Sequence, residues 1–401
     1  MKILIELHDR DDPILNILSC LVIRPELVVF ISDEKLHRQR FQRPLRKVMQ
    51  MAGLETELEF VHLELTEIDA AKEGLTAILD KYGDGECILD VSGGNDLLLM
   101  AAGMCCQQRR LALVSHRVGS NRMRWLWGPQ KGQEQSYNVQ LGVAQVIAMA
   151  GGEMLRHGHI VRSDLDDMFR ETINAIFGVY AANRQKWPQF VQYLQQTDDF
   201  SGIGGDPLRI CAPKCIYCNG HGLHLDLKIL SELADVGAIE DIRINSSQCA
   251  FRFGSEKIQK YLCDVGIWLE LYLHANMADS GLFDAVEASV VVSWDDTDED
   301  QDTVNEIDLI ATAGVGRLFI SCKTAVPDNA ALNEISTLTR RFGGRYAIPV
   351  LATMCDLKQD SPAVFRRAAE MGIAIIDADD LGRETLKKKL ASLRQRWDQQ
   401  S

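Results

Sequence analysis

The sequence lacks any long apolar run. No stretch approaches the roughly 20 consecutive apolar residues that cross a bilayer. The N-terminal residues, MKILIELHDRDD, have neither the apolar core nor the small-residue cleavage site of a signal peptide. We therefore expect a cytoplasmic protein with no membrane partner.

The sequence also lacks a disulfide pattern. Its 11 cysteines are an odd number and are scattered, and two of them are neighbours, Cys105 and Cys106. This usage is typical of reduced thiols in a cytoplasm.

One cysteine-rich interval, CAPKCIYCNGHGLH, contains a Cys-x2-Cys pair with further cysteine and histidine residues nearby, a composition that can close a tetrahedral zinc site. Unliganded loop thiols are the alternative, and the sequence favours them because a strong zinc signature has two well-separated ligand pairs. The residues concerned are Cys211, Cys215, Cys218, His221 and His224.

An excess of positive charge is absent as well. The formal net charge is -14, which argues against a protein that coats nucleic acid, because an acidic protein repels polyphosphate at long range. Contact with nucleic acid would need bound metal or a local basic surface. Basic residues cluster at 37–47, 116–124 and 339–345, which are either such surfaces or solvated helix and loop faces.

In the first 150 residues, short apolar runs alternate with amphipathic stretches. The runs at 2–7, 27–32, 86–92 and 111–116 are typical of buried strands. Strand and helix alternation at this spacing predicts a parallel, doubly wound α/β sheet. Ligands of such sheets bind beyond the carboxyl ends of the strands.

Two loops lie at that edge, HDRDDP after the first strand and SGGND after the third. Gly93 and Gly94, before a helix, allow backbone N–H groups to face a phosphate. Asp96 either contacts the ligand or caps the helix. The predicted ligand-binding residues are His8, Arg10, Ser92, Gly93, Gly94, Asn95 and Asp96.

The region 151–262 has a different character. It begins with helical sequence, continues through the cysteine-rich interval, and ends with a helix followed by a hairpin of two short strands. That last pattern is shared with winged-helix modules. We expect a spacer that packs the two ends of the chain together, with DNA reading by the hairpin as the alternative.

The region 263–401 predicts a second α/β domain. A helix over 255–281 leads into strands at 286–294, 305–313 and 317–325, and a hydrophilic insert at 295–303 is expected to be a solvated loop. Asp308 and Lys323 would lie on neighbouring strands, with Glu270 on the preceding helix.

An acid and a lysine placed in this way suit metal-assisted cleavage of phosphodiesters. Carboxylates bind a hard divalent ion, the ion lowers the pKa of a bound water, and a lysine stabilises developing charge. An edge ion pair between Asp308 and Lys323, with Glu270 exposed, explains the spacing equally well. A carboxylate is missing at position 321, which is Ser321.

The motifs GIWLELY, NEIDLI, LFISCKT and LTRRFGGRYAIPVL resemble the PD-(D/E)xK nuclease half of the ancillary nucleases of type III CRISPR systems. The segment DVSGGNDLLLMAAG is similar to the Gly-Gly ligand loop of their CARF domain. The resemblance implies a Rossmann-like CARF domain at 1–150, a helical and winged-helix-like linker region at 151–262, and a restriction-endonuclease-like α/β domain at 263–401.

The resemblance also implies roles for particular residues. Lys323, Asp308 and Glu270 would be catalytic, and Glu270, Asp308 and the backbone carbonyl of Cys322 would bind Mg²⁺ or Mn²⁺. Ser321 leaves this set one carboxylate short, and Glu306 or Glu334 would supply the missing charge.

The implied partners are a cyclic oligoadenylate, with cyclic tetra-adenylate as the first expectation, a DNA or RNA substrate, and a second copy of the chain in a homodimer. Two other readings stay open: a sensor or scaffold with a degenerate nuclease core, and a ligand-responsive transcription regulator.

Overall fold

The computed structural model describes residues 1–36, 41–65, 67–83, 87–109, 111–202, 205–218, 220–294 and 304–399. The predicted insert at 295–303 and part of the basic cluster at 37–47 lie outside these ranges. Within them, none of the helices is both long and apolar enough to cross a membrane.

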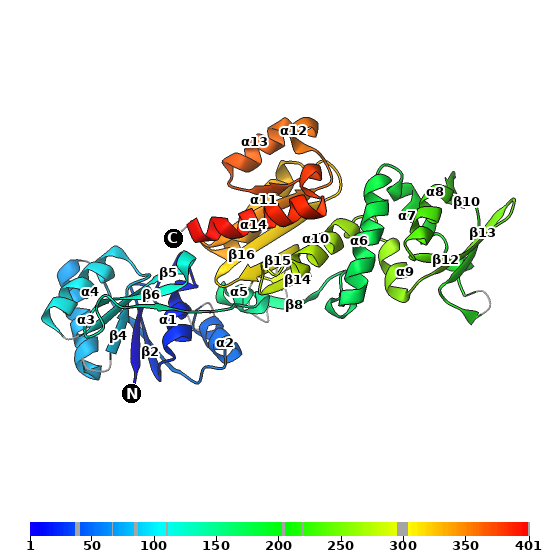
Figure 1. The fold of residues 1–401 in the computed structure, drawn as a ribbon. Helices are drawn as coiled ribbons and strands as arrows, with labels where there is room; N and C mark the ends of the chain where they lie inside the picture. The colour runs from blue at the N-terminus through cyan, green and yellow to red at the C-terminus, as the bar shows by residue number, and fades with distance from the viewer. Residues whose placement is uncertain are drawn as a thin grey trace.

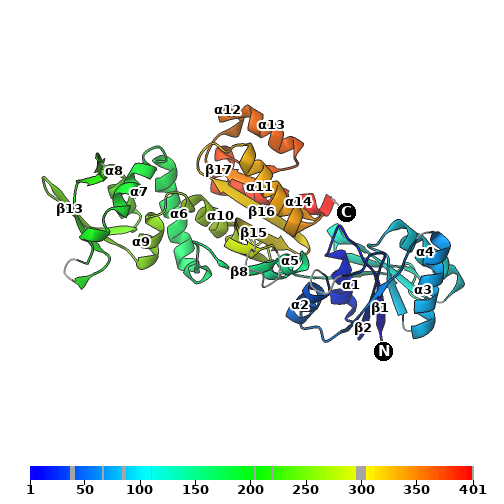
Figure 2. The same cartoon turned by 180° about the vertical axis from the view of Figure 1, so that it is seen from behind.

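The molecule has three parts arranged in a row (Figure 1). The N-terminal domain lies at one end, the C-terminal domain in the centre and the middle segment of the chain at the other end, as the view from behind also shows (Figure 2). The expectation of a spacer between the two ends is therefore wrong: the N-terminal and C-terminal domains contact each other directly and share one apolar core.

The N-terminal domain is a seven-stranded sheet in the order β3-β2-β1-β4-β5-β6-β7. The first five strands are parallel and the last two antiparallel. Helices cover both faces, so the predicted doubly wound sheet is confirmed. The strands are β1 (Ile3–Leu7), β2 (Leu27–Ser32), β3 (Glu57–His62), β4 (Cys87–Asp90), β5 (Ala112–Arg117), β6 (Arg122–Trp127) and β7 (Glu134–Ser136), and the helices are α1 (Leu15–Ile23), α2 (Arg43–Met51), α3 (Ile68–Tyr82) and α4 (Asp96–Gln108).

The order of this sheet marks a ligand position. The chain winds outwards from β1 through β2 to β3, then crosses back to β4 on the other side of β1. Ligands of such sheets bind at the carboxyl edge, beside the loops that follow the two strands at the reversal. The loops after β1 and β4 are the two predicted to bind a ligand.

The middle segment folds as helices around small sheets. A three-stranded sheet has the order β12-β13-β9, and β10 pairs with β11. The predicted hairpin after a helix is present as β12 and β13. The elements are α6 (Asp167–Ala182), α7 (Trp187–Gln195), β9 (Arg209–Pro213), β10 (Cys215–Cys218), β11 (His221–His224), α8 (Leu227–Asp235), β12 (Ile239–Ile244), β13 (Gln248–Phe253) and α9 (Glu256–Leu262).

The C-terminal domain is a six-stranded mixed sheet in the order β18-β17-β16-β15-β14-β8. Its core strands are almost wholly buried, with α10 and α14 packed on one face and α11 and α13 on the other. The elements are α10 (Ile267–Asp279), β14 (Ala285–Ser293), β15 (Val304–Ala313), β16 (Gly316–Lys323), α11 (Asn329–Gly343), β17 (Ala347–Thr353), α12 (Leu357–Asp360), α13 (Pro362–Glu370), β18 (Ala374–Ile376) and α14 (Arg383–Gln399).

Two elements between the domains tie them together. Helix α5 (Val143–Met149) belongs to the apolar core that runs from α1 and α2 to α11. The next element, β8 (Glu153–His157), falls inside the region predicted as a linker, yet it is the edge strand of the C-terminal sheet and pairs with β14.

Candidate active site

Asp308 lies where the ladder between β14 and β15 is interrupted. Ala288 pairs with Leu309 and Val290 pairs with Ile307, but the position between them, Ser289 opposite Asp308, is not paired. Ser289 has φ 54 and is fully buried. A left-handed backbone at a serine is strained, and such strain is concentrated at functional sites.

The carboxylate of Asp308 reaches across to β16. Its Oδ2 accepts a hydrogen bond from the backbone N–H of Cys322 at 2.6 Å and a weaker one from Ser321 Oγ at 3.3 Å. Lys323, which follows Cys322, is the last residue of β16 and is half-buried. The Asp308 carboxylate thus contacts Ser321 and Cys322, the two residues that precede Lys323.

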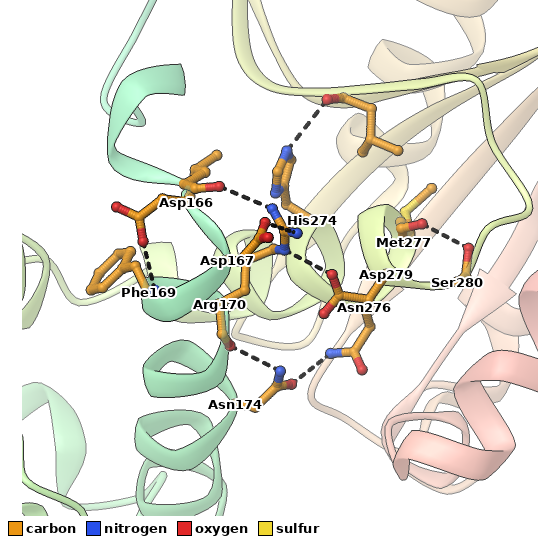
Figure 3. A network of polar contacts seen from close by, with 12 residues as sticks. Asp166, Asp167, Phe169, Arg170, Asn174, His274, Asn276, Met277, Asp279 and Ser280 are labelled. Carbon is orange, nitrogen blue, oxygen red and sulfur yellow. Dashed lines mark hydrogen bonds and ion pairs between the residues drawn. The ribbon is translucent and has the colours of Figure 1, made fainter.

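Glu270 approaches from helix α10, which packs on the sheet and is fixed from the opposite side by α6 (Figure 3). Arg170 Nε donates to Asp279 at 2.7 Å, and Asn276 Nδ2 donates to the Asn174 side chain at 2.8 Å. His274 Nε2 lies 3.3 Å from the carbonyl of Val286 on β14. These contacts hold both flanks of α10, so Glu270 has a defined place over the sheet.

The electrostatics of the two acids show that they share one site. Burial, followed by the charge of Asp308, raises the pKa of Glu270 to about 9. Burial also raises the pKa of Asp308, while the hydrogen bond from Cys322 and the charge of Lys323 act against that rise. Two half-buried acids that repel each other in this way favour a positive charge between them.

A cavity of about 450 Å³ opens at this place. Glu270, Cys322 and Lys323 line one side of it, and the first turns of α11, including Glu334, line the other. Asp308 is not among the described residues that line the cavity, but its carboxylate accepts a hydrogen bond from Cys322, which does line it. Substrate would therefore reach Glu270 and Lys323 directly.

The donor set fits a hard divalent cation. Glu270 and Asp308 supply carboxylate oxygens whose mutual repulsion a cation would remove. In the part of the chain that the structure describes, no three His, Cys, Asp or Glu side chains are arranged to hold a metal. A bound ion would therefore complete its shell with backbone carbonyls, as expected for Cys322, and with water.

Glu306 is the further acid that the surroundings hold in place. Ser289 Oγ donates a short hydrogen bond to Glu306 Oε1, and a Cβ at Gly158 would lie 2.3 Å from the same oxygen. The charge of Glu306 raises the pKa values of both Glu270 and Asp308. Nothing in the sequence favoured Glu306 over Glu334. The hydrogen bond from Ser289 and the close approach of Gly158 to Glu306 could not be predicted from it.

At the N-terminal domain, the structure packs the two predicted ligand loops against each other. A Cβ at Gly93 would lie 2.7 Å from Asp9 Cβ, and a Cβ at Gly94, which has φ 102, would lie 2.6 Å from Leu7 Cβ. Both glycines are therefore needed for this close approach.

The side chains predicted to bind the ligand are placed differently from one another. The Asn95 side chain caps α4 by accepting from Leu98 N–H, so Asp96 is the first helical residue and not the cap. Arg10 is exposed and pairs with Glu34 at 2.7 Å. His8 is buried, and burial lowers its pKa.

Ser92 is part of a buried network that the sequence did not predict. Its hydroxyl accepts from the backbone N–H of His116 at 2.8 Å and binds Asp90, which in turn accepts from Ser19 Oγ at 2.5 Å. The signal in the sequence that could have revealed this network is the set of polar residues at the ends of two apolar runs, in DVS (90–92) and VSH (114–116). The network fixes the start of the SGGND loop from below.

The cysteine-rich interval is divided between two elements: Cys211 lies on β9, and the residues from Cys215 to His224 include the paired strands β10 and β11. Cys215 pairs with His224, with 3.7 Å between Sγ and Nε2, and Cys218 pairs with His221. Residues three apart on a strand point to opposite faces, so the two pairs are separated by the hairpin itself. The structure does not gather the five predicted residues at one point.

Comparison with known proteins supports the C-terminal assignment. Residues 255–396 match the family model of the Card1-like endonuclease domain. No curated protein matches the sequence significantly.

Two solved structures share the fold over almost the whole chain. One is protein VC1899 from Vibrio cholerae, with a TM-score of 0.74 and 16% identity over 100% of this chain and 99% of that chain. The other is Can2 from Sulfobacillus thermosulfidooxidans in complex with cyclic tetra-adenylate, with a TM-score of 0.68 and 16% identity over 98% of this chain and 99% of that chain. The site at Glu270, Asp308 and Lys323 therefore lies in the region that matches the model of the Card1-like endonuclease domain, on a chain whose fold is similar to that of Can2.

Proposed function

We propose that this protein is a divalent-metal-dependent endonuclease that hydrolyses phosphodiester bonds of DNA or RNA and is switched on by a cyclic oligoadenylate. The observation that carries the proposal is the meeting of Asp308, Glu270 and Lys323 beside one cavity, inside a Card1-like endonuclease domain. At such a site, Mg²⁺ or Mn²⁺ supplies Lewis acidity and lowers the pKa of a bound water.

Each remaining role at the site is assigned to a residue of the chain. Glu270 and Asp308 would hold the ion, and the N–H of Cys322 fixes the orientation of the Asp308 carboxylate. Lys323 faces the cavity, where its ammonium group neutralises charge on the scissile phosphate. Ser321, which donates a hydrogen bond to Asp308, contributes no charge. We therefore expect this site to bind metal more weakly than a site with a carboxylate at position 321.

Activation would begin at the loops after β1 and β4. Their place at the reversal of the sheet, and the glycine N–H groups before α4, suit a phosphate-bearing ligand. Can2 was solved with cyclic tetra-adenylate, and we propose the same ligand class here. A symmetric ring would be held across a two-fold axis by a homodimer.

The test incubates the full-length protein with single-stranded DNA, single-stranded RNA and supercoiled plasmid. Each substrate is combined with Mn²⁺ or Mg²⁺ and with or without cyclic tetra-adenylate. We expect cleavage that requires metal, is increased by the activator, and is lost in Lys323→Ala.

Three results would contradict the proposal. Unchanged cleavage by Lys323→Ala would remove the site assignment. The absence of cleavage under every combination would favour a degenerate sensor. A sequence-specific gel shift that depends on the β12–β13 hairpin, without cleavage, would favour a transcription regulator.

A further inference from the structure

A buried ion pair joins the N-terminal domain to the C-terminal domain. Asp12, in the loop after β1, is 0% exposed, and Arg317, at the start of β16, is 2% exposed. Arg317 Nη2 lies 3.6 Å from Asp12 Oδ1. The guanidinium also donates to the carbonyls of Gly343 and Val315, the latter at 2.7 Å. Charges are removed from water in this way only when each has a partner.

On one side, the pair is continuous with the predicted ligand loops. The N–H of Asp12 donates to Asp9 Oδ1 at 2.7 Å, and Asn16 Oδ1 accepts from the N–H of Asp9 at 2.7 Å. Asp9 Cβ occupies the space that a side chain at Gly93 would need. A ligand that shifts the SGGND loop therefore pushes on Asp9, and Asp9 shares its loop with Asp12.

On the other side, the pair is continuous with the proposed active site. Arg317 is the second residue of β16, the strand that ends at Lys323. This strand is hydrogen-bonded to β15 as far as Ile320 and, from Arg317 to Lys323, to β17. A strand held in a close-packed interior transmits a displacement along its length. The six residue steps from Arg317 to Lys323 span about 20 Å, at about 3.3 Å each.

Two further polar contacts between the domains are more exposed than this pair. Lys47 pairs with Glu153 at 2.8 Å, and both side chains are more than a third exposed. Gln140 donates to Asp284 at 2.8 Å in an exposed position. Exposed contacts of this kind form and break at little cost in water, whereas separation of the buried Asp12–Arg317 pair would leave the Asp12 carboxylate without its charge partner.

Space is available next to the pair. A cavity of about 200 Å³ lies between the domains and is lined by Arg10 and Asp11 of the ligand loop and by Arg317 and Gly344 of the C-terminal domain, among others. A Cβ at Gly344, which has φ 64, would lie 3.0 Å from both Arg317 and Asp12. The contact is therefore tight at the pair and open beside it, which leaves room for one domain to shift against the other.

We propose that Asp12 and Arg317 are positioning residues that transmit occupancy of the ligand loops to β16 and thereby to Cys322 and Lys323. The inference rests on the proposed function, because it names the contact through which the ligand regulates the nuclease site. Neither residue touches the reacting atoms.

The test uses thermodynamic reciprocity. If a bound activator raises the affinity for substrate by some factor, a bound substrate must tighten activator binding by the same factor. The Kd of cyclic tetra-adenylate is measured on the full-length protein, alone and with Ca²⁺ plus a saturating phosphorothioate oligonucleotide that is not cleaved. We expect the ratio of the two Kd values to be about fivefold or more in the unaltered protein, a typical coupling strength.

The decisive variants are Arg317→Met and the double variant Asp12→Asn with Arg317→Met. In Arg317→Met we expect the Kd of the activator alone to stay within about twofold, since Arg317 is outside the ligand loops, and the ratio to fall towards one. The double variant removes both charges and so guards against unfolding by an unpaired buried aspartate. Arg317→Lys should restore part of the ratio. Lys47→Gln is the matched control, because it removes an exposed cross-domain ion pair.

The outcomes separate the two proposals. A folded Arg317→Met or double variant that keeps the full ratio overturns the inference, as does an equal loss in Lys47→Gln. A ratio of one in an unaltered protein that binds activator and cuts also overturns it, but leaves the proposed function standing. No activator binding by the unaltered protein removes both.

Discussion

Asp308 Oδ2 accepts a hydrogen bond from the backbone N–H of Cys322 at 2.6 Å. The backbone ladder between β15 and β16 ends at the pair Leu309 and Ile320, so Asp308 is the first residue of β15 beyond the ladder. The carboxylate therefore takes the place of a backbone acceptor at the point where the two strands separate. One acid thus fixes the end of β16 beside Lys323, and in the proposed function the same acid would bind the metal.

These two roles of Asp308 can be separated by substitution. An asparagine at 308 can still accept from Cys322 through its amide oxygen, whereas an alanine leaves that N–H without its acceptor. We expect Asp308→Asn to keep the stability of the protein but to lose metal-dependent cleavage by about 10²-fold or more. Asp308→Ala should lose cleavage and also about 1–3 kcal/mol in the free energy of unfolding. Thermal denaturation and a cleavage assay on the same preparations test this, and normal cutting by Asp308→Asn would contradict the role in metal binding.

Glu270 makes the stability of the metal-free protein depend on pH. Burial and the charge of Asp308 raise the pKa of Glu270 above its ordinary value of 4.5, to about 9. The folded protein therefore keeps a proton that the unfolded chain releases, so the contribution of Glu270 to stability is complete below pH 4.5 and is lost as the pH rises towards 9. We expect the free energy of unfolding, measured in a chelator, to fall over this range.

The variant Glu270→Gln provides the control for that pH dependence. A glutamine cannot ionise, so the decline with rising pH should be shallower than in the unaltered protein. Addition of Mn²⁺ should stabilise the unaltered protein most at the alkaline end, where Glu270 is free to bind the ion. Identical pH curves for the two proteins would show that Glu270 keeps an ordinary pKa.

Ser321→Glu should have effects of opposite sign with and without metal. Ser321 is buried and lies 3.3 Å from Asp308 Oδ2, so a carboxylate there adds repulsion to the metal-free site and lowers the free energy of unfolding by about 1–3 kcal/mol. With Mn²⁺ the added charge should tighten ion binding about tenfold, because ligand charge governs affinity at such sites. Denaturant unfolding in a chelator measures the change in stability, and calorimetric titration with Mn²⁺ measures the change in ion binding, with Ser321→Ala as the uncharged control in both.

Glu306 and Glu334 can be ranked in the same titration. Glu306 is held by Ser289 and acts electrostatically on both Glu270 and Asp308, whereas Glu334 is an exposed residue of α11 at the cavity. We expect Glu306→Gln to weaken Mn²⁺ binding about tenfold, a typical loss for a residue next to a metal shell, and Glu334→Gln to change it little. The reverse order would assign the missing charge to Glu334.

Much of the sheet architecture could be predicted from local pattern. The strands β1, β2, β4 and β5 and the C-terminal strands are buried aliphatic runs, whose composition alone marks them. Strand β3 was missed because ELEFVH has charged residues and lies at the sheet edge. Helix α1 was missed because LNILSCLVI is apolar on all sides and shows no helical period.

Other features depend on contacts that no local pattern contains. The helix predicted over 255–281 is two helices, α9 and α10, separated at Cys263–Gly266. Their spacing in the sequence identified Asp308 and Lys323 as site candidates, but the Asp12–Arg317 pair joins positions far apart in the chain. Nothing near either residue predicts its partner.

The edge position of β8 has a consequence for work with fragments. A fragment starting at residue 255, where the match to the endonuclease family begins, would leave β8 behind and expose the edge of β14. That edge belongs to a nine-residue, largely buried strand, and such an edge is a template for pairing with other chains. We therefore expect the excised nuclease domain to aggregate or to dimerise edge to edge, and any activity it shows would describe that assembly.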